Sequence, residues 1–143
     1  TDRSVEIIGS SAFHTRSGLT KINVPYGVTE IQNFAFTNCS RLTDVTLPET
    51  LINMGAMAFY GCGMSEITIP DSVTTIGMYA FSVCPNLTTV TFGSVITTLN
   101  DRAFGDGNNQ TITTINVPWS EGEVAGAPWG AVNATINYNY VKE

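Results

Sequence analysis

Apolar residues recur along this chain in short alternating runs. Leu19, Ile22 and Val24 form one such run, and Val28 and Ile31 follow it closely. Alternation over a few residues is typical of a half-buried strand, whereas an amphipathic helix needs a sustained spacing of three and four residues. No window of the sequence keeps the helical spacing. The pattern therefore predicts pairs of short strands joined by polar turns, with a single helical turn at most.

The same order of residues returns about every 23 positions. Each unit has apolar residues at its positions 1, 4 and 6, usually a proline, a second apolar pair at positions 10 and 13, and then Ala-Phe. The phenylalanines are 23, 23, 22 and 23 residues apart. The pairs are Ala12-Phe13, Ala35-Phe36, Ala58-Phe59, Ala80-Phe81 and Ala103-Phe104. One unit cannot bury its own apolar edge, but stacked units can. We expect a right-handed coil of parallel strands about 4.8 Å apart.

This period divides one repeat domain, residues 1–143, into units that we call rungs. The predicted units are a partial rung at 5–18, full rungs at 19–41, 42–63, 64–86 and 87–110, a half rung at 111–118 and a C-terminal cap at 119–143. The cap region carries both tryptophans, Trp119 and Trp129. Large aromatics suit the covering of a last open rung, although the pair could also form a platform on which sugars stack.

Both ends of the chain give further expectations. Residues 134–140 alternate as a strand, with Ile136, Tyr138 and Tyr140 on one face. At the other end the sequence offers no comparable cap. Either residues 1–4 fold over the first rung or more protein lies upstream, and the pattern favours the second. The chain then resembles the terminal piece of a longer protein.

Composition narrows the classes of function. Hydrophobic residues make up 43% of the chain and charged residues 13%, which is too apolar for disorder. The formal net charge is −6 without any basic cluster, so nucleic acid and anionic membranes are poor partners. No apolar run approaches the roughly 20 residues of a membrane span, and we expect no direct membrane insertion. No phosphate loop, nucleophile elbow or paired-carboxylate motif appears, so we expect no enzyme and no cofactor.

Three cysteines share one position of successive rungs, namely Cys39, Cys62 and Cys84. At strand spacing the column spans roughly 10 Å, too far for all three thiolates to bind one metal ion. The alternatives are a disulfide between adjacent rungs, a nucleophile paired with the only histidine, His14, or small buried side chains. The column favours buried side chains, because burial opposes a reactive thiolate.

Oxygen-bearing side chains in the segment 105–109 suggest a calcium loop, but the spaced acidic ligands of such loops are missing. An inter-rung turn explains its glycines and asparagines better. His14 is interpreted as a turn residue. We therefore expect no metal site.

The outward positions of the first strand in each rung form the candidate partner-binding face. They are Lys21, Asn23, Asp44, Thr46, Glu66, Thr68, Thr89, Thr91, Thr114 and Asn116. This face is polar, rich in hydroxyls and mildly acidic at its middle. The alternative is a solvated sheet in which threonine simply favours the strand. An ice-binding array is disfavoured, because charges interrupt the column and only Thr89 and Thr91 give the Thr-x-Thr pair.

The recurring Leu-Thr-x-Val-x-Ile-Pro, Val-Thr-x-Ile-Gly and Ala-Phe-x-x-Cys motifs are most complete at 64–86. They resemble the leucine-rich repeats of BspA-like (Treponema pallidum type) bacterial surface proteins over about residues 5–118. The departures are Arg16 and Gly107 at the cysteine position, Gly93 at the proline position, and Gln32 and Asn100 at the glycine position. The resemblance implies a leucine-rich-repeat solenoid, mostly β with little helix and with an irregular C-terminal cap.

The same resemblance implies a secreted or cell-surface protein that adheres to another protein or to a surface glycan. Its strand face would be the binding surface. The competing hypothesis is a structural or receptor-recognition module of a larger assembly, such as a phage tail-associated protein. A secretion signal with an anchor in the full-length precursor would favour the first, and neighbouring virion genes the second. Neither the partner nor the oligomeric state follows from the sequence.

Overall fold

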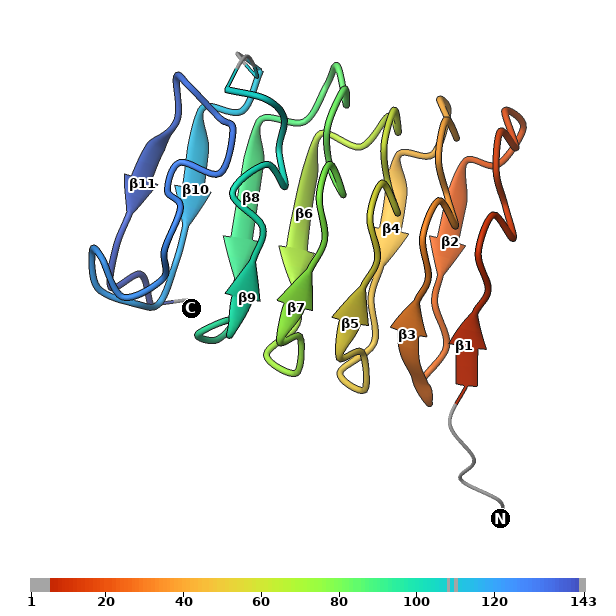
Figure 1. Cartoon of the computed structure of the whole chain (residues 1–143). Coiled ribbons are helices and arrows are strands. Elements are labelled where there is room, and N and C mark those ends of the chain that lie inside the picture. Colours follow the sequence, from red (N-terminus) through yellow and green to blue (C-terminus); the bar gives the residue numbers. More distant parts are fainter. Residues whose placement is uncertain (1–5, 108, 110, 142–143) are drawn as a thin grey trace.

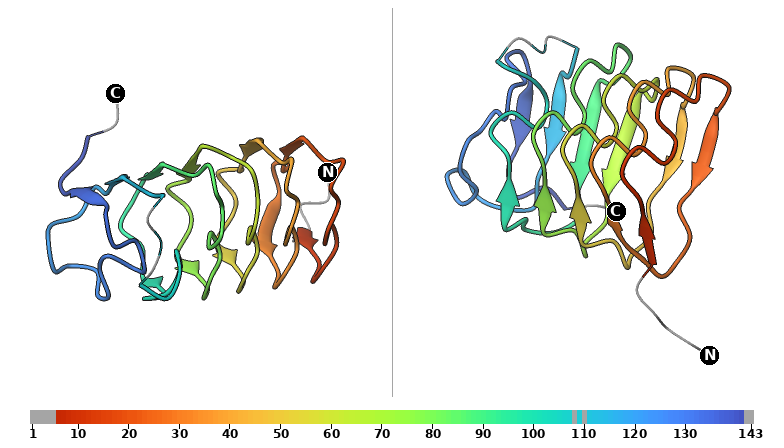
Figure 2. Two further views of the ribbon diagram at one scale, coloured as in Figure 1. Left: turned by 90° about the horizontal axis from the view of Figure 1, so that it is seen from above. Right: turned by 45° about the vertical axis from the view of Figure 1, so that its right-hand side comes forward.

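The chain forms a parallel β-solenoid of about six turns. The computed structural model describes residues 6–107, 109 and 111–141 and contains no helix within these ranges. Every strand pairing is parallel, as the repeat predicts. Successive turns of the chain stack as a row of loops (Figure 2). The predicted solenoid of short strands is therefore confirmed.

Two faces of the solenoid carry the strands (Figure 1). The first face contains β2 (Lys21–Asn23), β4 (Asp44–Thr46), β6 (Glu66–Ile69), β8 (Thr89–Phe92), β10 (Thr114–Asn116) and β11 (Thr135–Asn137). The second face is one sheet in the order β1 (Glu6–Ile8), β3 (Val28–Ile31), β5 (Asn53–Met54), β7 (Thr75–Ile76) and β9 (Thr98–Leu99). The apolar residues of both faces point between them and form one core.

Phenylalanines of the Ala-Phe pairs form a column through this core. Phe36, Phe59 and Phe81 are fully buried, and their ring centroids lie 5.0 and 5.6 Å apart with nearly parallel planes. The next ring, Phe104, is also buried but lies 6.3 Å from Phe81 and is tilted by 35°. The regular stack thus loosens at the last full rung, where the repeat also departs from its motif.

The Ala-Phe segments are turns and not helical. The residue before alanine has a left-handed backbone in four rungs, at Ser11, Phe34, Met57 and Tyr79. A second left-handed residue follows two positions after phenylalanine, as at Asn38 and Val83. Non-glycine residues rarely adopt this conformation, because the side chain crowds the backbone. Stacking of identical turns holds it here, since Phe36 N donates to Ala58 O and Phe59 N to Ala80 O, both at 2.8 Å.

Close stacking explains the glycine that follows the second strand of a rung. A side chain on Gly77 would lie 2.7 Å from the backbone nitrogen of Ala56, and one on Gly55 would lie 2.6 Å from that of Asn33. Neither glycine has a positive φ. The glycine lets neighbouring rungs approach.

The C-terminal region closes the solenoid with a strand and two buried rings. β11 pairs in register with β10, and its residue Ile136 lies opposite Ile115. Trp119 and Trp129 are buried, and their rings meet edge to face at 6.0 Å. A sugar-stacking platform needs an exposed ring face, which neither tryptophan has.

The strand in this region is shorter than the alternation of residues 134–140 predicts. Asn139 has a left-handed backbone, and its N–H donates to Trp119 O at 2.9 Å. The strand therefore does not continue past β11, and Tyr140 N donates to Val117 O at 2.9 Å. Residues 1–4, which the sequence placed either over the first rung or after further protein, lie outside the described residues.

Candidate functional site

The predicted polar residues lie on the first face, and their exposure changes along it. Lys21, Asn23, Asp44, Thr46, Glu66 and Thr68 are exposed, whereas Thr89, Thr91 and Thr114 are half-buried. Asn116 is buried. Among the predicted residues, the exposed ones therefore lie on β2, β4 and β6.

Asn116 belongs to a ladder of polar side chains across the last strands. Its amide nitrogen donates to Thr91 Oγ1 at 3.1 Å, and its amide oxygen accepts from Asn137 Nδ2 at 2.7 Å. These bonds satisfy the buried amide and join β8, β10 and β11. Asn116 therefore supports the sheet and offers no free amide to a partner.

The first face is interrupted between β4 and β6. Its strands form one pair, β2–β4, and a separate sheet in the order β11–β10–β8–β6 (Figure 1). In the β2–β4 pair, Val24 N donates to Thr46 O at 3.0 Å and Asp44 N to Thr20 O at 3.2 Å. The equivalent bonds from Leu47 N to Thr68 O and from Glu66 N to Thr43 O are absent among the described residues. Two strand edges thus face one another without pairing.

A cavity of about 340 Å³ fills this interruption, which we call the β4–β6 cleft. It is lined by residues 45–47 and 66–71 together with Glu49. Val45 is half-buried there, whereas Val90 and Ile115, at the same position of later rungs, are buried. The cleft therefore exposes part of the core beside polar side chains. It contains three of the predicted partner-binding residues, Thr46, Glu66 and Thr68.

A shortened turn leads into β6. Cys62 is followed by Met64 after one residue, whereas two residues separate Cys39 from Leu42 and Cys84 from Leu87. The longer turns are closed by a hydrogen bond from Leu42 N to Cys39 O at 3.0 Å and by its equivalent at Leu87.

In the shortened turn this bond is replaced by one across rungs, from Gly63 N to Leu42 O at 3.0 Å. A side chain on Gly63 would lie 2.5 Å from Ser40 O. The missing residue thus changes how the chain enters β6, next to the place where pairing with β4 fails.

The cleft has an acidic lining. Glu49, Glu66 and Asp71 are exposed at its edge, and within the described ranges none of them forms an ion pair. Asp44 on the neighbouring strand is paired with Lys21 at 3.7 Å, and both side chains are well exposed. Such a surface pair contributes little stability. The centre of the first face is therefore negative and open to cationic groups.

The cysteine column is buried and contains free thiols only. Each thiol donates to the phenylalanine carbonyl of the preceding rung, at 3.0 Å from Cys39 to Phe13, 3.1 Å from Cys62 to Phe36 and 3.2 Å from Cys84 to Phe59. The expected buried side chains are therefore present, and they also link adjacent rungs. His14 is exposed and contacts Thr15 Oγ1 at 3.0 Å.

Burial sets the acidity of these thiols. It raises the pKa of Cys84 from its ordinary value of 9.0 to about 11 and also raises the pKa of Cys62 and Cys39. The folded chain thus favours the neutral thiol, which is a poor nucleophile. The cysteine column therefore has the properties of a structural element.

The free energy of unfolding at alkaline pH should depend on the ionisation of the Cys84 thiol. Because its pKa is higher in the folded chain, its contribution to the free energy of unfolding is complete below pH 9 and declines as pH rises to about 11. That contribution is about 3 kcal/mol, because each unit of pKa difference corresponds to about 1.4 kcal/mol. Cys84→Ala should lose about 1 kcal/mol at pH 7 and then decline less steeply between pH 9 and 11. Urea unfolding at several pH values between 9 and 11 measures how steeply the free energy of unfolding falls with pH in each protein. Equal slopes for the wild type and Cys84→Ala would contradict the raised pKa of the thiol.

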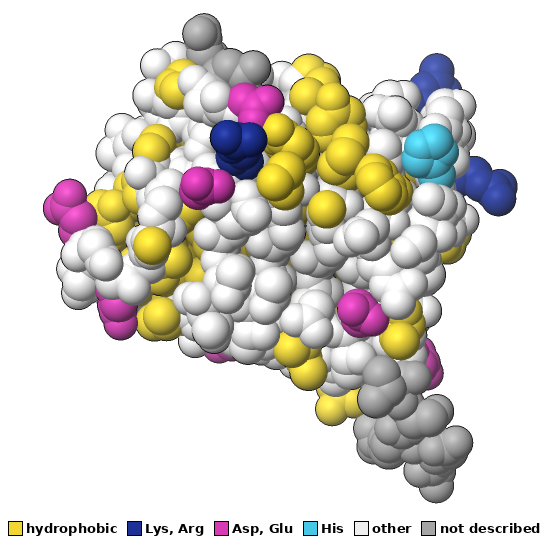
Figure 3. Space-filling view, in the orientation of Figure 1, with side chains coloured by type: hydrophobic (Ala, Val, Ile, Leu, Met, Phe, Trp, Pro, Cys, Tyr) yellow, Lys and Arg dark blue, Asp and Glu magenta, His cyan; other side chains and the backbone are white. Residues whose placement is uncertain are grey.

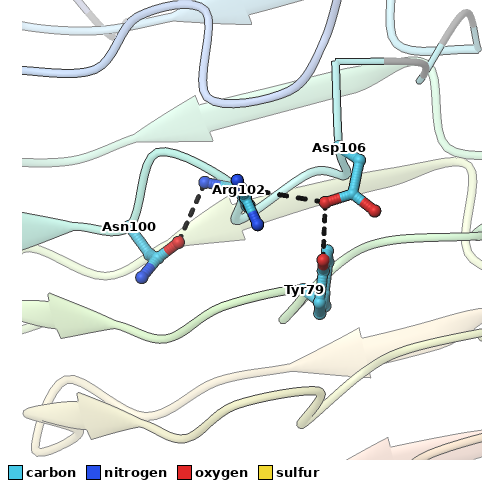
Figure 4. A network of polar contacts seen from close by, with 4 residues as sticks. All are labelled: Tyr79, Asn100, Arg102 and Asp106. Carbon is cyan, nitrogen blue, oxygen red and sulfur yellow. Dashed lines mark hydrogen bonds and ion pairs between the residues drawn. The ribbon is translucent and has the colours of Figure 1, made fainter.

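The segment 105–109, which the sequence favours as a turn over a calcium loop, has two side-chain oxygens, Asp106 Oδ1 and Asn109 Oδ1, in contact with protein groups. Asp106 accepts a hydrogen bond from Tyr79 Oη at 2.5 Å and lies 3.8 Å from Arg102, and Arg102 N donates to Asn100 Oδ1 (Figure 4). The bond to Asp106 raises the pKa of Tyr79. Asn109 Oδ1 accepts from the backbone nitrogens of Thr111 and Ile112. Asn108 lies outside the described residues.

Within the described part of the chain, no group of three His, Cys, Asp or Glu side chains is arranged to hold a metal ion. The same residues include no helix with the length and apolar character needed to cross a membrane.

Hydrophobic side chains also reach the surface on the side of the Ala-Phe turns. Phe34, Met78 and Val83 are exposed there, and Val83 has 60% of its surface accessible. The space-filling view shows hydrophobic side chains gathered in a band, with charged side chains at its margins (Figure 3). This band was not among the surfaces that the sequence singled out, because the repeat assigns the Ala-Phe segment to the core.

Comparison with known proteins supports the assignment of the repeat. The family description "BspA type leucine rich repeat region" matches residues 6–124 in six copies. No curated protein matches the chain. Among solved structures, a leucine-rich repeat protein of Treponema pallidum superimposes with a TM-score of 0.79 at 24% identity, over 95% of this chain and 63% of that one.

Two further structures resemble the chain. A leucine-rich repeat protein from Bacteroides ovatus gives a TM-score of 0.66 at 33% identity, over 81% of this chain and 30% of that one. A leucine-rich cell surface protein from Faecalibacterium prausnitzii gives 0.58 at 25% identity, over 76% and 38%. The chain thus spans from under a third to just under two thirds of the length of these relatives. From the family match and the stacked rungs, the chain belongs to the BspA-type leucine-rich-repeat family.

Proposed function

We propose that the chain is a non-enzymatic binding module of a secreted or surface-attached bacterial protein. In this proposal the first face of the solenoid captures another protein or a surface glycan. Leucine-rich-repeat solenoids are typically scaffolds without catalysis. One similar structure, from Faecalibacterium prausnitzii, is described as a cell surface protein. The first observation supports a non-enzymatic role, and the second supports a location at the cell surface.

The observation that carries the proposal is the exposed centre of the first face. Asp44 and Glu66 lie on the two strands that flank the β4–β6 cleft, and both are exposed. On β8 and β10 the predicted residues are half-buried or, like Asn116, buried and bonded to neighbouring side chains. Contact surfaces need polar groups that remain available, and charged groups at their rim increase the rate of association. The centre of the face meets these conditions.

Charge reversal at this centre should weaken capture. We expect Asp44→Lys with Glu66→Lys to reduce binding to the captured ligand by about tenfold, mainly through slower association. The measurement is biolayer interferometry of the protein against a panel of immobilised extracellular-matrix proteins and glycans. The matched control is Glu121→Lys, which reverses an exposed charge in the C-terminal region. Equal binding of the double variant and the control, or no capture on the panel, would count against the proposal.

A further inference from the structure

The β4–β6 cleft has the features of a site for an extended peptide. We propose that it binds a Lys- or Arg-bearing segment of the partner in extended conformation, with the segment pairing along the open strand edges. The inference rests on the proposed function, because it names the part of the partner that the first face would hold. Three independent features of the cleft carry it.

The first feature is the pair of unpaired edges. In a parallel sheet the N–H and C=O groups of alternate residues point to the same neighbouring strand. The bonds between β2 and β4 show which residues of a rung face the next rung. By that pattern the backbone groups of Val45 on one side and of Glu66 and Thr68 on the other are directed into the cleft. An open strand edge is a template for the backbone of another chain.

The second feature is space with both apolar and polar walls. The cleft holds about 340 Å³ and gives access to the half-buried Val45 beside the exposed Thr46 and Thr68. An extended peptide presents side chains alternately to its two sides. The side chains on one side of the peptide would cover Val45, and those on the other side would contact the polar surface.

The third feature is charge. Glu49, Glu66 and Asp71 line the cleft, and no lysine or arginine is among its lining residues. A second hollow, of about 620 Å³, shares Glu49 and Asp71 and extends past Gly93 and Pro118 to Tyr140. The two carboxylates therefore stand where the hollows meet. A cationic side chain on the bound segment would find opposite charges there, which favours lysine or arginine over acidic residues.

The shortened turn before β6 provides a variant that tests the cleft itself. Replacing Gly63 with Pro-Asn copies the turn at Pro85-Asn86 and restores the missing residue. We expect this variant to pair β6 with β4 and to close the cleft without changing any of its charges. Protection of the Glu66 and Thr68 amides from hydrogen exchange would report the pairing.

The probe is a fluorescent ten-residue peptide that alternates threonine and lysine, compared with a peptide that alternates threonine and glutamate. Fluorescence anisotropy with the full chain at low salt measures binding. We expect the lysine peptide to bind, the glutamate peptide to bind at least tenfold more weakly, and the Pro-Asn variant to lose at least tenfold in affinity. Glu66→Gln should weaken binding severalfold, while the matched Glu121→Gln should not.

These outcomes separate the inference from the proposed function. If the lysine peptide does not bind, or binds the closed variant equally, the peptide site is wrong. If the Pro-Asn variant does not fold, Glu66→Gln is compared with Glu121→Gln instead. Equal affinities of these two variants for the lysine peptide would overturn the inference. In another outcome, the charge-reversed protein loses binding to the panel ligand while the Pro-Asn variant keeps it. That result would support the binding face and rule out the peptide site. If the chain self-associates and the Pro-Asn variant does not, the occupant of the cleft is a second copy of the chain. This result would also overturn the inference.

Discussion

Phe59→Ala should lower the free energy of unfolding by about 3–5 kcal/mol, the usual range for emptying a buried phenylalanine site. Phe59 is fully buried, and its ring stacks on Phe36 at 5.0 Å and on Phe81 at 5.6 Å. Stability in a repeat protein depends on contacts between neighbouring rungs. Loss of the middle ring therefore weakens the contacts to both neighbours at once.

Urea unfolding followed by circular dichroism measures this change. The control is Val95→Ala, which also removes apolar atoms but from a residue with 48% of its surface exposed. We expect the control to change stability by no more than about 0.5 kcal/mol. A loss below about 1 kcal/mol for Phe59→Ala would mean that the phenylalanine column does not hold the rungs together.

Trp129→Ala should lower the free energy of unfolding by a similar amount, about 3–5 kcal/mol. The ring is fully buried, it packs against Trp119, and its Nε1 donates to Ala125 O at 2.8 Å. Trp119 in turn contacts Phe92 at 5.2 Å, so the pair joins the cap to the first face. Removing Trp129 opens the end of the solenoid, which must be covered for a repeat array to remain stable.

Thermal and urea unfolding of Trp129→Ala measure the effect of the cap. Val132→Ala is the control, because Val132 lies in the same region with 46% of its surface exposed. Trp129→Phe should retain much of the apolar contact and lose less stability than the alanine variant. If Trp129→Ala is as stable as its control, the cap does not depend on this ring.

The sequence was sufficient to predict the architecture because one period determines many contacts at once. Ile76, Ala80, Phe81 and Cys84 fall at fixed positions of a unit, and all four are buried where the stacked-rung pattern places them. Two short strands per rung also follow from the alternation of apolar positions. The local conformation at Ala-Phe could not be predicted in the same way. Its left-handed residues include Phe34 and Met57, whose side chains give no sign of a positive φ.

Prediction of the candidate site was less complete. Outward positions on the first strand could be assigned from the period, but the burial of Asn116 depends on Thr91 and Asn137 in neighbouring rungs. The β4–β6 cleft was also missed, because pairing between strands is a property of the backbone. One signal was present, namely the single residue between Cys62 and Met64. A change of one residue in the period marks where the stacking of rungs can change.

The binding surface itself is tested most directly by hydrogen exchange of the full chain with and without a ligand captured from the panel. The account predicts that protection on binding is centred on the amides of Val45, Glu66 and Thr68. These residues lie on the strands that border the cleft. Protection confined to the band of exposed hydrophobic side chains around Phe34 and Val83, with no change at β4 and β6, would contradict it.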